Sequence, residues 1–439
     1  MFNPEIPDVP SHLFHQSHQN RETLKTDRYR IDLTTSAGRW ENWVVKLEFN
    51  KLGEGKHGNG FYINIPNSKH DVILTAGHNL VDAPNHFCTQ IRIITPLAEI
   101  PVSNNNLRVC ERYKVEPNEN NAIYDYGVIL LDRDRKAPRR GFGFNLMLGL
   151  AASREGRKEG DVLQNRALSV SGYKPQDSPQ NSKPTNLPRR AEGSCVKANS
   201  YQLMYSAKTE EGMSGGPVWL GFRGVETVVA VHNYGAEDSG EGNRGSRLNL
   251  DLLTTIFGFD DLKLGWTNVS LQYLGSPAYS MHLHLYSPSS TAPGKIAPEG
   301  RVRVGKPGRL ETWFDVLPVS APPDEKDSEG CYAFRLHDVE PARWLGWDAN
   351  GRKVTLVSRF DARCEVKLLH VVIQPGKPFA IRAQLKANEW VEVRMGMALL
   401  DENDLEALEA DPESYEDTSE ILFEPISKEK VGLWFFRLL

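Results

Sequence analysis

An all-β architecture is the fold class that this 439-residue sequence predicts, with a barrel or sandwich of antiparallel strands first and a second β domain after it. Three observations predict it. Short runs of β-branched and aromatic residues recur along the chain, separated by clusters of glycine, proline and asparagine. Long amphipathic helical patterns are nearly absent from roughly the first 250 residues. The last part of the chain repeats a strand-rich pattern three times.

The strands of the first region are expected where apolar residues run together or alternate with polar ones. Six segments meet this description: WVVKLEF (43–49), GFYINI (60–65), DVILTAG (71–77), QIRIITPL (90–97), YGVILL (126–131) and VETVVAVH (225–232). Residues 174–200 contain four prolines and many polar residues, so we expect a surface loop there. The segment DLLTTIFGFDDL, near 251–264, has helical spacing and is expected to end the first domain.

The remainder of the chain is expected to form a β-trefoil-like domain with a threefold internal repeat. Similar opening strands are YSMHLHLYS from 279, YAFRLHDVE from 332 and FAIRAQLKA from 379, and similar closing strands are TWFDVLPV from 312, CEVKLLHVV from 364 and ILFEPI from 421. Units of roughly fifty residues with about four short strands each are typical of this barrel, which serves mostly for binding. Three loose repeats also arise by chance in β-rich domains. The acidic segment 399–420 is interpreted as a solvated helix or loop within the third unit.

Composition excludes several classes of function. The formal net charge is −5 with both signs interspersed, so no basic face indicates a nucleic-acid partner. No apolar run is long enough for a membrane span, and the first segment lacks the basic-then-apolar order of a secretory signal, so we expect a cytoplasmic protein. The five cysteines are scattered without a CxxC pair, which favours reduced thiols over a disulfide framework or a metal site. We expect no cofactor.

The segment GMSGGPVW (212–219) raises the question of catalysis. A serine among glycines either marks a tight turn or exposes Ser214 as a nucleophile, and a nucleophilic hydroxyl needs a base and a group that orients the base. His78 follows an apolar strand in DVILTAGHNLVD, and Asp125 precedes one in YDYGVILLD. An α/β-hydrolase also uses GxSxG, but its serine enters a helix, whereas a strand-like run follows here.

The segments TAGH, DYGVILL and GMSGGP, in this order, resemble the three catalytic segments of trypsin-like serine proteases. The resemblance implies a chymotrypsin-like double β-barrel with a catalytic triad of His78, Asp125 and Ser214. It also implies an oxyanion hole formed by the backbone N–H groups of Gly212 and Ser214.

Two further segments are similar to the glutamyl endopeptidase branch of that family, namely DRYRIDLTTSAGRWENWVVKLEF (27–49) and VVAVHNYG (228–235). The likeness covers roughly residues 27–258. The chain is therefore expected to divide into an N-terminal extension (1–27), a trypsin-like serine protease domain (28–262), a linker (263–278) and the β-trefoil-like binding domain (279–439).

The resemblance also suggests which residues bind the substrate. In the glutamyl branch a threonine and a histidine bind the substrate carboxylate, and Thr209 and His232 match them. Lys208 stands six positions before the serine, where trypsin-like proteases place the residue at the base of the primary pocket, and its cation would attract an acidic side chain. The resemblance thus implies cleavage after Glu or Asp. Glu210 and Glu211 adjoin this pocket and would repel such a substrate.

The resulting hypothesis is an intracellular serine endopeptidase that acts on a protein or peptide substrate. Its C-terminal domain would recruit the substrate or a partner, which is a protein or a glycan. The absence of a repeated QxW pattern favours a protein over a glycan. The alternative is a catalytically silent scaffold or binding protein with a protease fold.

Overall fold

The computed structural model describes the chain from Arg39 onward in segments. The residues outside the description are 1–38, 67, 96–97, 134–138, 150–160, 175–186, 236–241, 263, 274–280, 287–300, 306–312, 322–330, 340–341, 349–352, 359, 370–379, 387–388, 394–422, 425–433 and 439. The expected extension (1–27) and the acidic segment (399–420) therefore lie outside the described residues. Met1–Arg39 and Trp40–Leu439 are separate compact units, and the sheets described below belong to the second.

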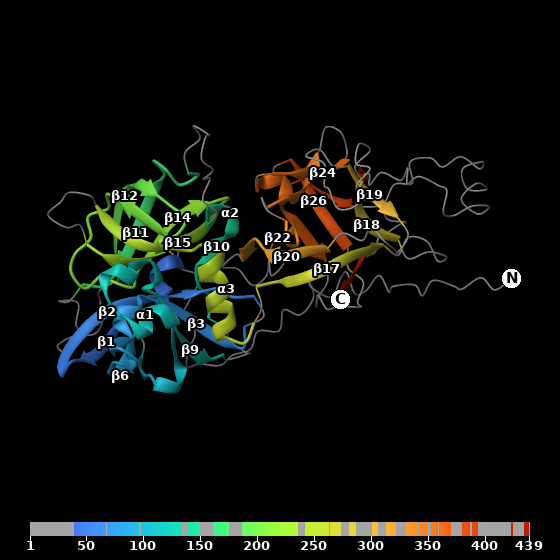
Figure 1. The fold of residues 1–439 in the computed structure, drawn as a ribbon. Coiled ribbons are helices and arrows are strands. Elements are labelled where there is room, and N and C mark those ends of the chain that lie inside the picture. Colours follow the sequence, from blue (N-terminus) through green and yellow to red (C-terminus); the bar gives the residue numbers. More distant parts are fainter. Residues whose placement is uncertain are drawn as a thin grey trace, which may run out of the picture. The chain divides into compact units, whose positions relative to one another are not determined.

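The first sheet has seven antiparallel strands in the order β7-β6-β1-β2-β3-β9-β8 (Figure 1). Their bounds are β1 (Val44–Lys51), β2 (Glu54–Ile63), β3 (His70–Thr75), β6 (Thr89–Ile94), β7 (Glu99–Pro101), β8 (Leu107–Val109) and β9 (Gly127–Asp132), and the hairpin of β4 (Val81–Ala83) and β5 (His86–Phe87) stands beside them. The strands expected at 43–49, 60–65, 71–77, 90–97 and 126–131 are confirmed as β1, β2, β3, β6 and β9. Apolar runs bounded by turn residues predicted β1, β3, β9 and the second half of β2 because both of their faces are largely buried, whereas β6 has exposed residues between its buried ones.

The second sheet closes into a six-strand barrel. Its strands are β11 (Ala167–Gly172), β12 (Arg189–Ala198), β13 (Gln202–Tyr205), β14 (Pro217–Phe222), β15 (Val225–Tyr234) and β16 (Asn243–Arg247), with β10 (Gly143–Asn145) and β21 (Ser320–Ala321) added at its edge. Closure follows because β14 pairs with both β11 and β15. The closed barrel and the open first sheet match the chymotrypsin-like double barrel that the sequence predicts, and β15 confirms the strand expected at 225–232.

The surface loop expected at 174–200 is wrong for its second half. Residues 189–198 form β12, which pairs with β11 through Ala167↔Ser194 to Gly172↔Arg189 and with β13 on its other side. Most of its side chains are exposed or half-buried, so the strand carries no apolar run. Backbone pairing on both sides holds this strand in place, and hydrophobic patterning does not reveal such a strand.

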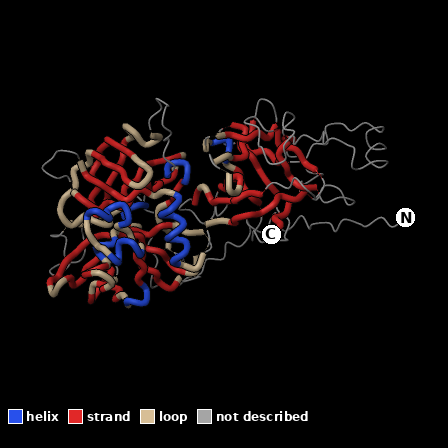
Figure 2. Tube along the Cα trace, in the orientation of Figure 1, coloured by secondary structure: helices blue, strands red, loops and turns tan. Residues whose placement is uncertain are grey.

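Helices are few and short, as Figure 2 shows among the red strands. They are α1 (Glu111–Val115), α2 (Leu146–Gly149) and α3 (Leu250–Phe259), with 3-10 turns at η3 (Arg39–Asn42), η4 (Gly77–Asn79), η5 (Asn104–Asn106), η6 (Glu119–Tyr124) and η9 (Ala362–Cys364). The helix expected near 251–264 is confirmed as α3. Asn249 caps it by accepting the Leu252 N–H, and its buried face comprises Leu252, Leu253, Ile256 and Phe257.

The core between the two sheets is aromatic. Phe142 is fully buried, and its ring stands edge-on to Trp43 and Phe61 at centroid distances of 5.1 and 5.7 Å. It also contacts Trp219 of β14 at 5.7 Å. Edge-on aromatic pairs add about 0.5–1.5 kcal/mol beyond the burial of their surface. This cluster therefore fixes the two sheets against each other, and the candidate site is built from residues of both.

A third sheet of twelve strands begins at β17. Its strands are β17 (Trp266–Tyr273), β18 (Met281–Tyr286), β19 (Arg301–Gly305), β20 (Trp313–Pro318), β22 (Cys331–Leu336), β23 (Trp344–Asp348), β24 (Lys353–Val357), β25 (Val366–Leu369), β26 (Ala380–Lys386), β27 (Glu389–Val393), β28 (Phe423–Glu424) and β29 (Trp434–Leu438). Pairings run from β29 through β17, β20, β22 and β25 to β26. Among the described residues no pairing of β26 with β29 closes this series, so the β-trefoil stays a prediction. β17 lies within the stretch 263–278 that was expected to be a linker.

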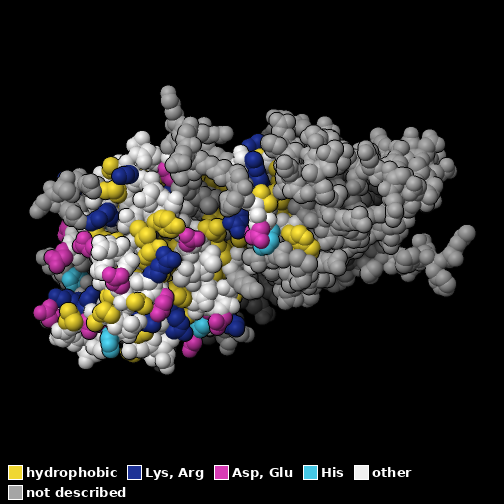
Figure 3. Space-filling view, viewed as in Figure 1, with side chains coloured by type: hydrophobic (Ala, Val, Ile, Leu, Met, Phe, Trp, Pro, Cys, Tyr) yellow, Lys and Arg dark blue, Asp and Glu magenta, His cyan; other side chains and the backbone are white. Residues whose placement is uncertain are grey.

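The described surface carries both signs of charge. In Figure 3 acidic and basic side chains alternate with apolar ones over the visible face of the two sheets. Within the described part of the chain, no helix has both the length and the apolar character that crossing a membrane requires.

Candidate active site

His78 and Asp125 come from the ends of two neighbouring strands. β3 and β9 pair over their whole length, up to Thr75↔Gly127, so the segments that follow β3 and precede β9 meet at one edge of the sheet. There Nδ1 of His78 lies 2.7 Å from Oδ2 of Asp125. The backbone N–H of His78 also donates to Oδ1 of Asp125 at 2.8 Å. The carboxylate therefore orients the imidazole through two contacts.

Asp125 is fully buried, and its surroundings keep it ionised. Burial acts to raise the pKa of this carboxyl, but the charge of His78 and the hydrogen bonds from His78 and Asn233 outweigh it, so the pKa lies below its ordinary value. The Asn233 side chain also donates to the Asp125 carbonyl oxygen at 2.6 Å and to Ser246 Oγ at 3.1 Å. A buried polar network from the second barrel thus fixes the acid of the first sheet.

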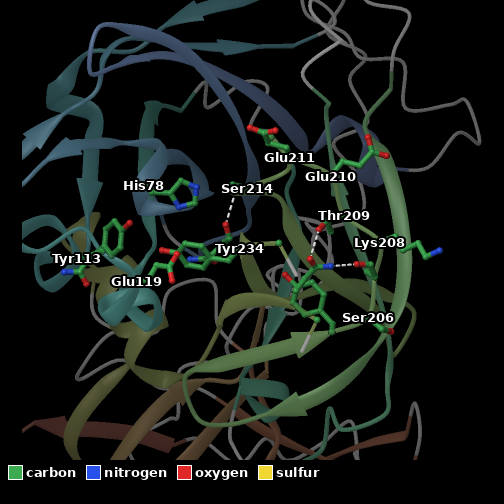
Figure 4. A pocket seen from close by; sticks show the side chains of 18 of the residues that line it. His78, Tyr113, Glu119, Ser206, Lys208, Thr209, Glu210, Glu211, Ser214 and Tyr234 are labelled. Carbon is green, nitrogen blue, oxygen red and sulfur yellow. Dashed lines mark hydrogen bonds between the residues drawn. The ribbon is translucent and has the colours of Figure 1, made fainter. Parts of the chain in front are cut away.

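Ser214 lies in the turn between β13 and β14, among glycines. Gly212 and Gly215 have φ angles of +84° and +85°, a backbone conformation that favours glycine. A Cβ atom at Gly215 would collide with the carbonyl oxygen of Asn59. The Ser214 hydroxyl donates to the Asn233 carbonyl oxygen at 3.0 Å, and within the described residues it makes no hydrogen bond with His78. His78 and Ser214 nevertheless line the same cleft (Figure 4).

The backbone around Ser214 is held by two asparagines of the first sheet. Asn59 donates from its side-chain Nδ2 to the Gly212 carbonyl and from its backbone N–H to the Ser214 carbonyl, both at 2.7 Å. Asn79 donates from Nδ2 to the Ser214 carbonyl at 3.0 Å. In the described part of the chain, the N–H groups of Gly212 and Ser214 donate to no protein atom. With its carbonyls fixed, this turn leaves two amide donors available to a ligand.

The cleft that contains these groups has a volume of about 940 Å³. Tyr113 and Tyr234 line it on the side of His78, and the Tyr234 ring lies 5.8 Å from the imidazole. Among the described residues that line it, three carry carboxylates and one carries an ammonium group: Glu119, Glu210, Glu211 and Lys208. The cleft is therefore lined by more negative than positive charge.

The three residues expected to bind substrate differ in their placement. Thr209 lines the cleft, and its hydroxyl donates to Asn243 Oδ1 at 2.9 Å. Lys208 is exposed, and its side chain points away from Ser214 in Figure 4. His232 is 2% exposed and lies behind the cleft wall, where its Nδ1 is 2.6 Å from the Tyr205 hydroxyl. Burial, followed by the charge of His78, lowers the pKa of His232 to about 3, so the protonated imidazole expected from the sequence is not favoured here.

Sequence reasoning missed the polar residues that support the site. Asn59, Tyr205 and Asn243 lie in strands β2, β13 and β16, and Asn233 lies in β15. Asn59, Tyr205 and Asn233 stand within or beside apolar runs, whereas Asn243 lies among glycine, arginine and serine and gives no such signal. Which of them meet depends on strand register, which a single sequence does not define.

Among the described residues no group of three or more His, Cys, Asp or Glu side chains is placed to hold a metal ion. No protein-family model and no curated protein sequence matches the chain.

Solved structures similar to this chain are proteases. The protease Anisep from Arthrobacter nicotinovorans is 16% identical, with 50% of this chain and 95% of that chain covered and a TM-score of 0.36. A thermostable serine protease, AL20, from an extremophilic microorganism is 12% identical over 50% of this chain and 98% of that chain, with a TM-score of 0.36. A Glu endopeptidase in complex with MPD is 16% identical over 52% of this chain and 95% of that chain, also with a TM-score of 0.36.

Proposed function

We propose that the chain is a serine endopeptidase whose triad is His78, Asp125 and Ser214. The observation that carries the proposal is the buried, ionised Asp125 bound to Nδ1 and to the backbone N–H of a histidine that opens on the same cleft as Ser214. An acid that fixes the histidine through Nδ1 leaves Nε2 to accept the proton of a serine.

In the proposed reaction the Ser214 hydroxyl rotates from the Asn233 carbonyl to Nε2 of His78, which takes its proton as the hydroxyl attacks the scissile carbonyl. The oxyanion that forms accepts hydrogen bonds from the Gly212 and Ser214 N–H groups, and each such donor contributes about 3–4 kcal/mol to the transition state. His78 then gives the proton to the leaving amine. Water then attacks the acyl-enzyme while His78 takes a proton from it, and His78 returns that proton to Ser214 as the ester bond breaks. Asp125 stays ionised throughout.

A preference for Glu or Asp before the scissile bond is the finer form of this proposal that the sequence resemblance implies. Thr209 supports it, because its hydroxyl lines the cleft. Lys208 does not support this preference because it is exposed. His232 does not support it either, because it is buried and neutral. We further propose a cytoplasmic location and a recruiting role for the C-terminal domain, both of which rest on the sequence.

A catalytically silent scaffold is the second candidate. One observation favours it, namely that the Ser214 hydroxyl is bonded to a backbone carbonyl instead of His78. Catalytic hydrogen bonds are often absent from unliganded proteases and form only with substrate, so this contact has little weight against the triad.

Labelling with a fluorophosphonate probe distinguishes the two candidates. The parent protein should react with the probe at Ser214, and mass spectrometry of the labelled peptide should locate the adduct. Ser214→Ala and His78→Ala should not be labelled, while Ser206→Ala, which removes another serine of the same cleft, should be labelled like the parent. Absence of labelling in a folded parent protein would leave the scaffold as the better reading.

A further inference from the structure

The inner wall of the cleft is polar but uncharged. Thr209 donates to Asn243 Oδ1 at 2.9 Å, and Asn243 Nδ2 donates to the Ala207 carbonyl oxygen (Figure 4). Tyr205 also lines this wall, and its hydroxyl is bound to His232. A substrate side chain that enters the cleft past Ser214 therefore contacts hydroxyl, amide and carbonyl groups.

His232 contributes no positive charge behind this wall. Its ring is 2% exposed, and the Tyr205 hydroxyl lies closer to Nδ1, at 2.6 Å, than to the Arg244 carbonyl, at 3.3 Å. The group bonded to Nδ1 is an uncharged hydroxyl and not a carboxylate that would hold a second proton on the ring, so the geometry fits a neutral imidazole. Burial and the charge of His78 both lower the pKa of His232, in agreement with a neutral ring.

Among the described residues, the cations near the cleft are turned away from Ser214 or are engaged with other side chains. Lys208 points away from Ser214, Lys174 is paired with Glu210, and the Arg244 guanidinium lies over the Tyr234 ring at 5.7 Å from its centre. The carboxylates of Glu119, Glu210 and Glu211, by contrast, belong to exposed residues that line the cleft. A substrate carboxylate would lose its hydration and approach the like charges of Glu119 and Glu211, since Lys174 already balances Glu210, and each effect opposes binding.

A carboxamide fits the same wall. Its NH₂ group donates to hydroxyl and carbonyl oxygens, and its own oxygen accepts one hydrogen bond without bringing a charge. A lysine or arginine side chain would gain from the rim carboxylates, yet the described residues of the inner wall include no acid to pair with it. We propose that the primary pocket takes the uncharged carboxamide of glutamine or asparagine in preference to the isosteric carboxylate or to a cation. This inference rests on the proposed serine endopeptidase activity.

The test uses peptides that differ only in the residue before the scissile bond, Gln, Glu or Lys, because Gln and Glu have the same shape and differ in charge. For the full-length protein at pH 7.5, we expect kcat/KM for the Gln peptide to exceed that for the other two by at least about tenfold, the equivalent of 1.4 kcal/mol. The advantage of Gln over Glu should shrink below about pH 5, where the Glu side chain gains a proton. A Glu or Lys preference, or no preference, would overturn the proposal.

Two variants examine the cause. Glu211→Gln removes one rim carboxylate and should narrow the gap between Gln and Glu peptides, whereas Glu99→Gln, on β7 outside the cleft, should leave it unchanged. Tyr205→Phe removes a hydroxyl of the inner wall, the one bound to His232, and should also reduce the Gln advantage. If the gap between Gln and Glu peptides is unchanged in both Glu211→Gln and Tyr205→Phe, the assignment of specificity to this wall is contradicted.

Binding to Ser214→Ala separates this inference from the activity on which it rests. Fluorescence polarisation with the uncleaved, labelled peptides should give a lower Kd for Gln than for Glu or Lys. If the parent cuts nothing and resists the probe while this order of Kd values holds, the endopeptidase proposal fails and the pocket assignment stands. If the parent cuts with another preference, the activity stands and the pocket assignment fails. Equal Kd values for the three peptides, or no binding of any peptide, would also overturn the pocket assignment.

Discussion

The side chain of Asn59 donates a hydrogen bond of 2.7 Å to the Gly212 carbonyl oxygen, which links the first sheet to the turn that presents Ser214. The same side chain binds Tyr173 twice, accepting its N–H at Oδ1 (2.7 Å) and donating to its carbonyl (3.1 Å). Asn59 is fully buried. Tyr173 holds this amide in place, and the amide holds the Gly212 carbonyl. The orientation of the turn is therefore fixed, and the proposed oxyanion donors depend on that orientation.

Asn59→Asp should therefore lower kcat by roughly tenfold to a hundredfold and change KM by less than about twofold. The isosteric carboxylate still accepts the Tyr173 N–H but has no proton to donate to Gly212, so the turn loses its restraint. Loss of one oxyanion donor costs about a hundredfold to a thousandfold, and a residue that only positions the donors should cost less. Steady-state kinetics with a peptide substrate gives the two constants.

A peptide boronic acid, which forms a tetrahedral adduct with the serine, should bind Asn59→Asp more weakly by about the factor lost in kcat. Asn106→Ala serves as the control, because it removes an asparagine that donates to the Leu130 carbonyl in the same sheet, outside the cleft. An Asn59→Asp enzyme with raised KM and unchanged kcat would indicate a role in substrate binding instead.

For the triad, Ser214→Ala and His78→Ala should each reduce kcat to near the uncatalysed level, and the double variant should be no slower than either single variant. The two side chains act as a unit, so their losses do not add. Thermal unfolding of Ser214→Ala should match the parent, because the hydroxyl makes one hydrogen bond to a carbonyl in a half-exposed turn. A double variant far slower than both singles would contradict the shared role.

The sequence predicted the ends of the strands that carry His78 and Asp125 of the proposed triad better than it predicted the residues around them. Apolar runs placed β3 and β9 correctly, and their side-by-side pairing brings His78 and Asp125 together. The environment of His232 was not predictable in the same way. Whether a histidine in β15 is protonated depends on Tyr205, a residue of another strand, and on burial that a single sequence does not report.

Strands whose stability comes from pairing alone also escaped prediction. β12 was expected as part of a loop because its residues are mostly exposed, although it pairs along both edges. Arg247 was not singled out either, yet it is buried in the second barrel. Its guanidinium donates to Asp161 at 2.6 and 3.0 Å and to the carbonyls of Leu148 and Asn199, both at 2.7 Å.

Replacing Arg247 with Ala should lower the free energy of unfolding by about 3–5 kcal/mol, because it leaves the Asp161 carboxylate and two carbonyls without their donor. Urea unfolding followed by tryptophan fluorescence measures the change. Arg92→Ala is the matched control, since Arg92 is 44% exposed in its pair with Glu48 and should cost at most about 1 kcal/mol. The double variant Arg247→Met with Asp161→Leu should recover part of the loss. Equal costs for Arg247→Ala and Arg92→Ala would mean that the buried pair contributes no more than a surface one.

The buried imidazole of His232 should make the protein less stable in acid. The pKa of His232 is about 3 in the folded chain, against about 6.5 in an unfolded one, so between these values the unfolded state binds the additional proton. The free energy of unfolding should therefore be independent of this group above pH 7 and fall as the pH drops below 6.5. The slope for one such proton is about 1.4 kcal/mol per pH unit, or roughly 2–3 kcal/mol between pH 6.5 and 4.5. The pKa of His57, which burial also lowers, should add to the same trend.

His232→Gln removes the titrating ring but keeps a group that can bind the Tyr205 hydroxyl. Its free energy of unfolding should thus decline less than that of the parent between pH 7.5 and 4.5, by roughly the 2–3 kcal/mol assigned to His232. Urea unfolding at three pH values in this range gives the two slopes, and His86→Gln, at an exposed position of β5, controls for a histidine-to-glutamine change on the surface. Parallel slopes for His232→Gln and the parent would mean that the folded protein accepts a proton on His232. A cation would then stand behind the cleft wall, and cleavage after Glu or Asp would regain the support that the neutral ring removes.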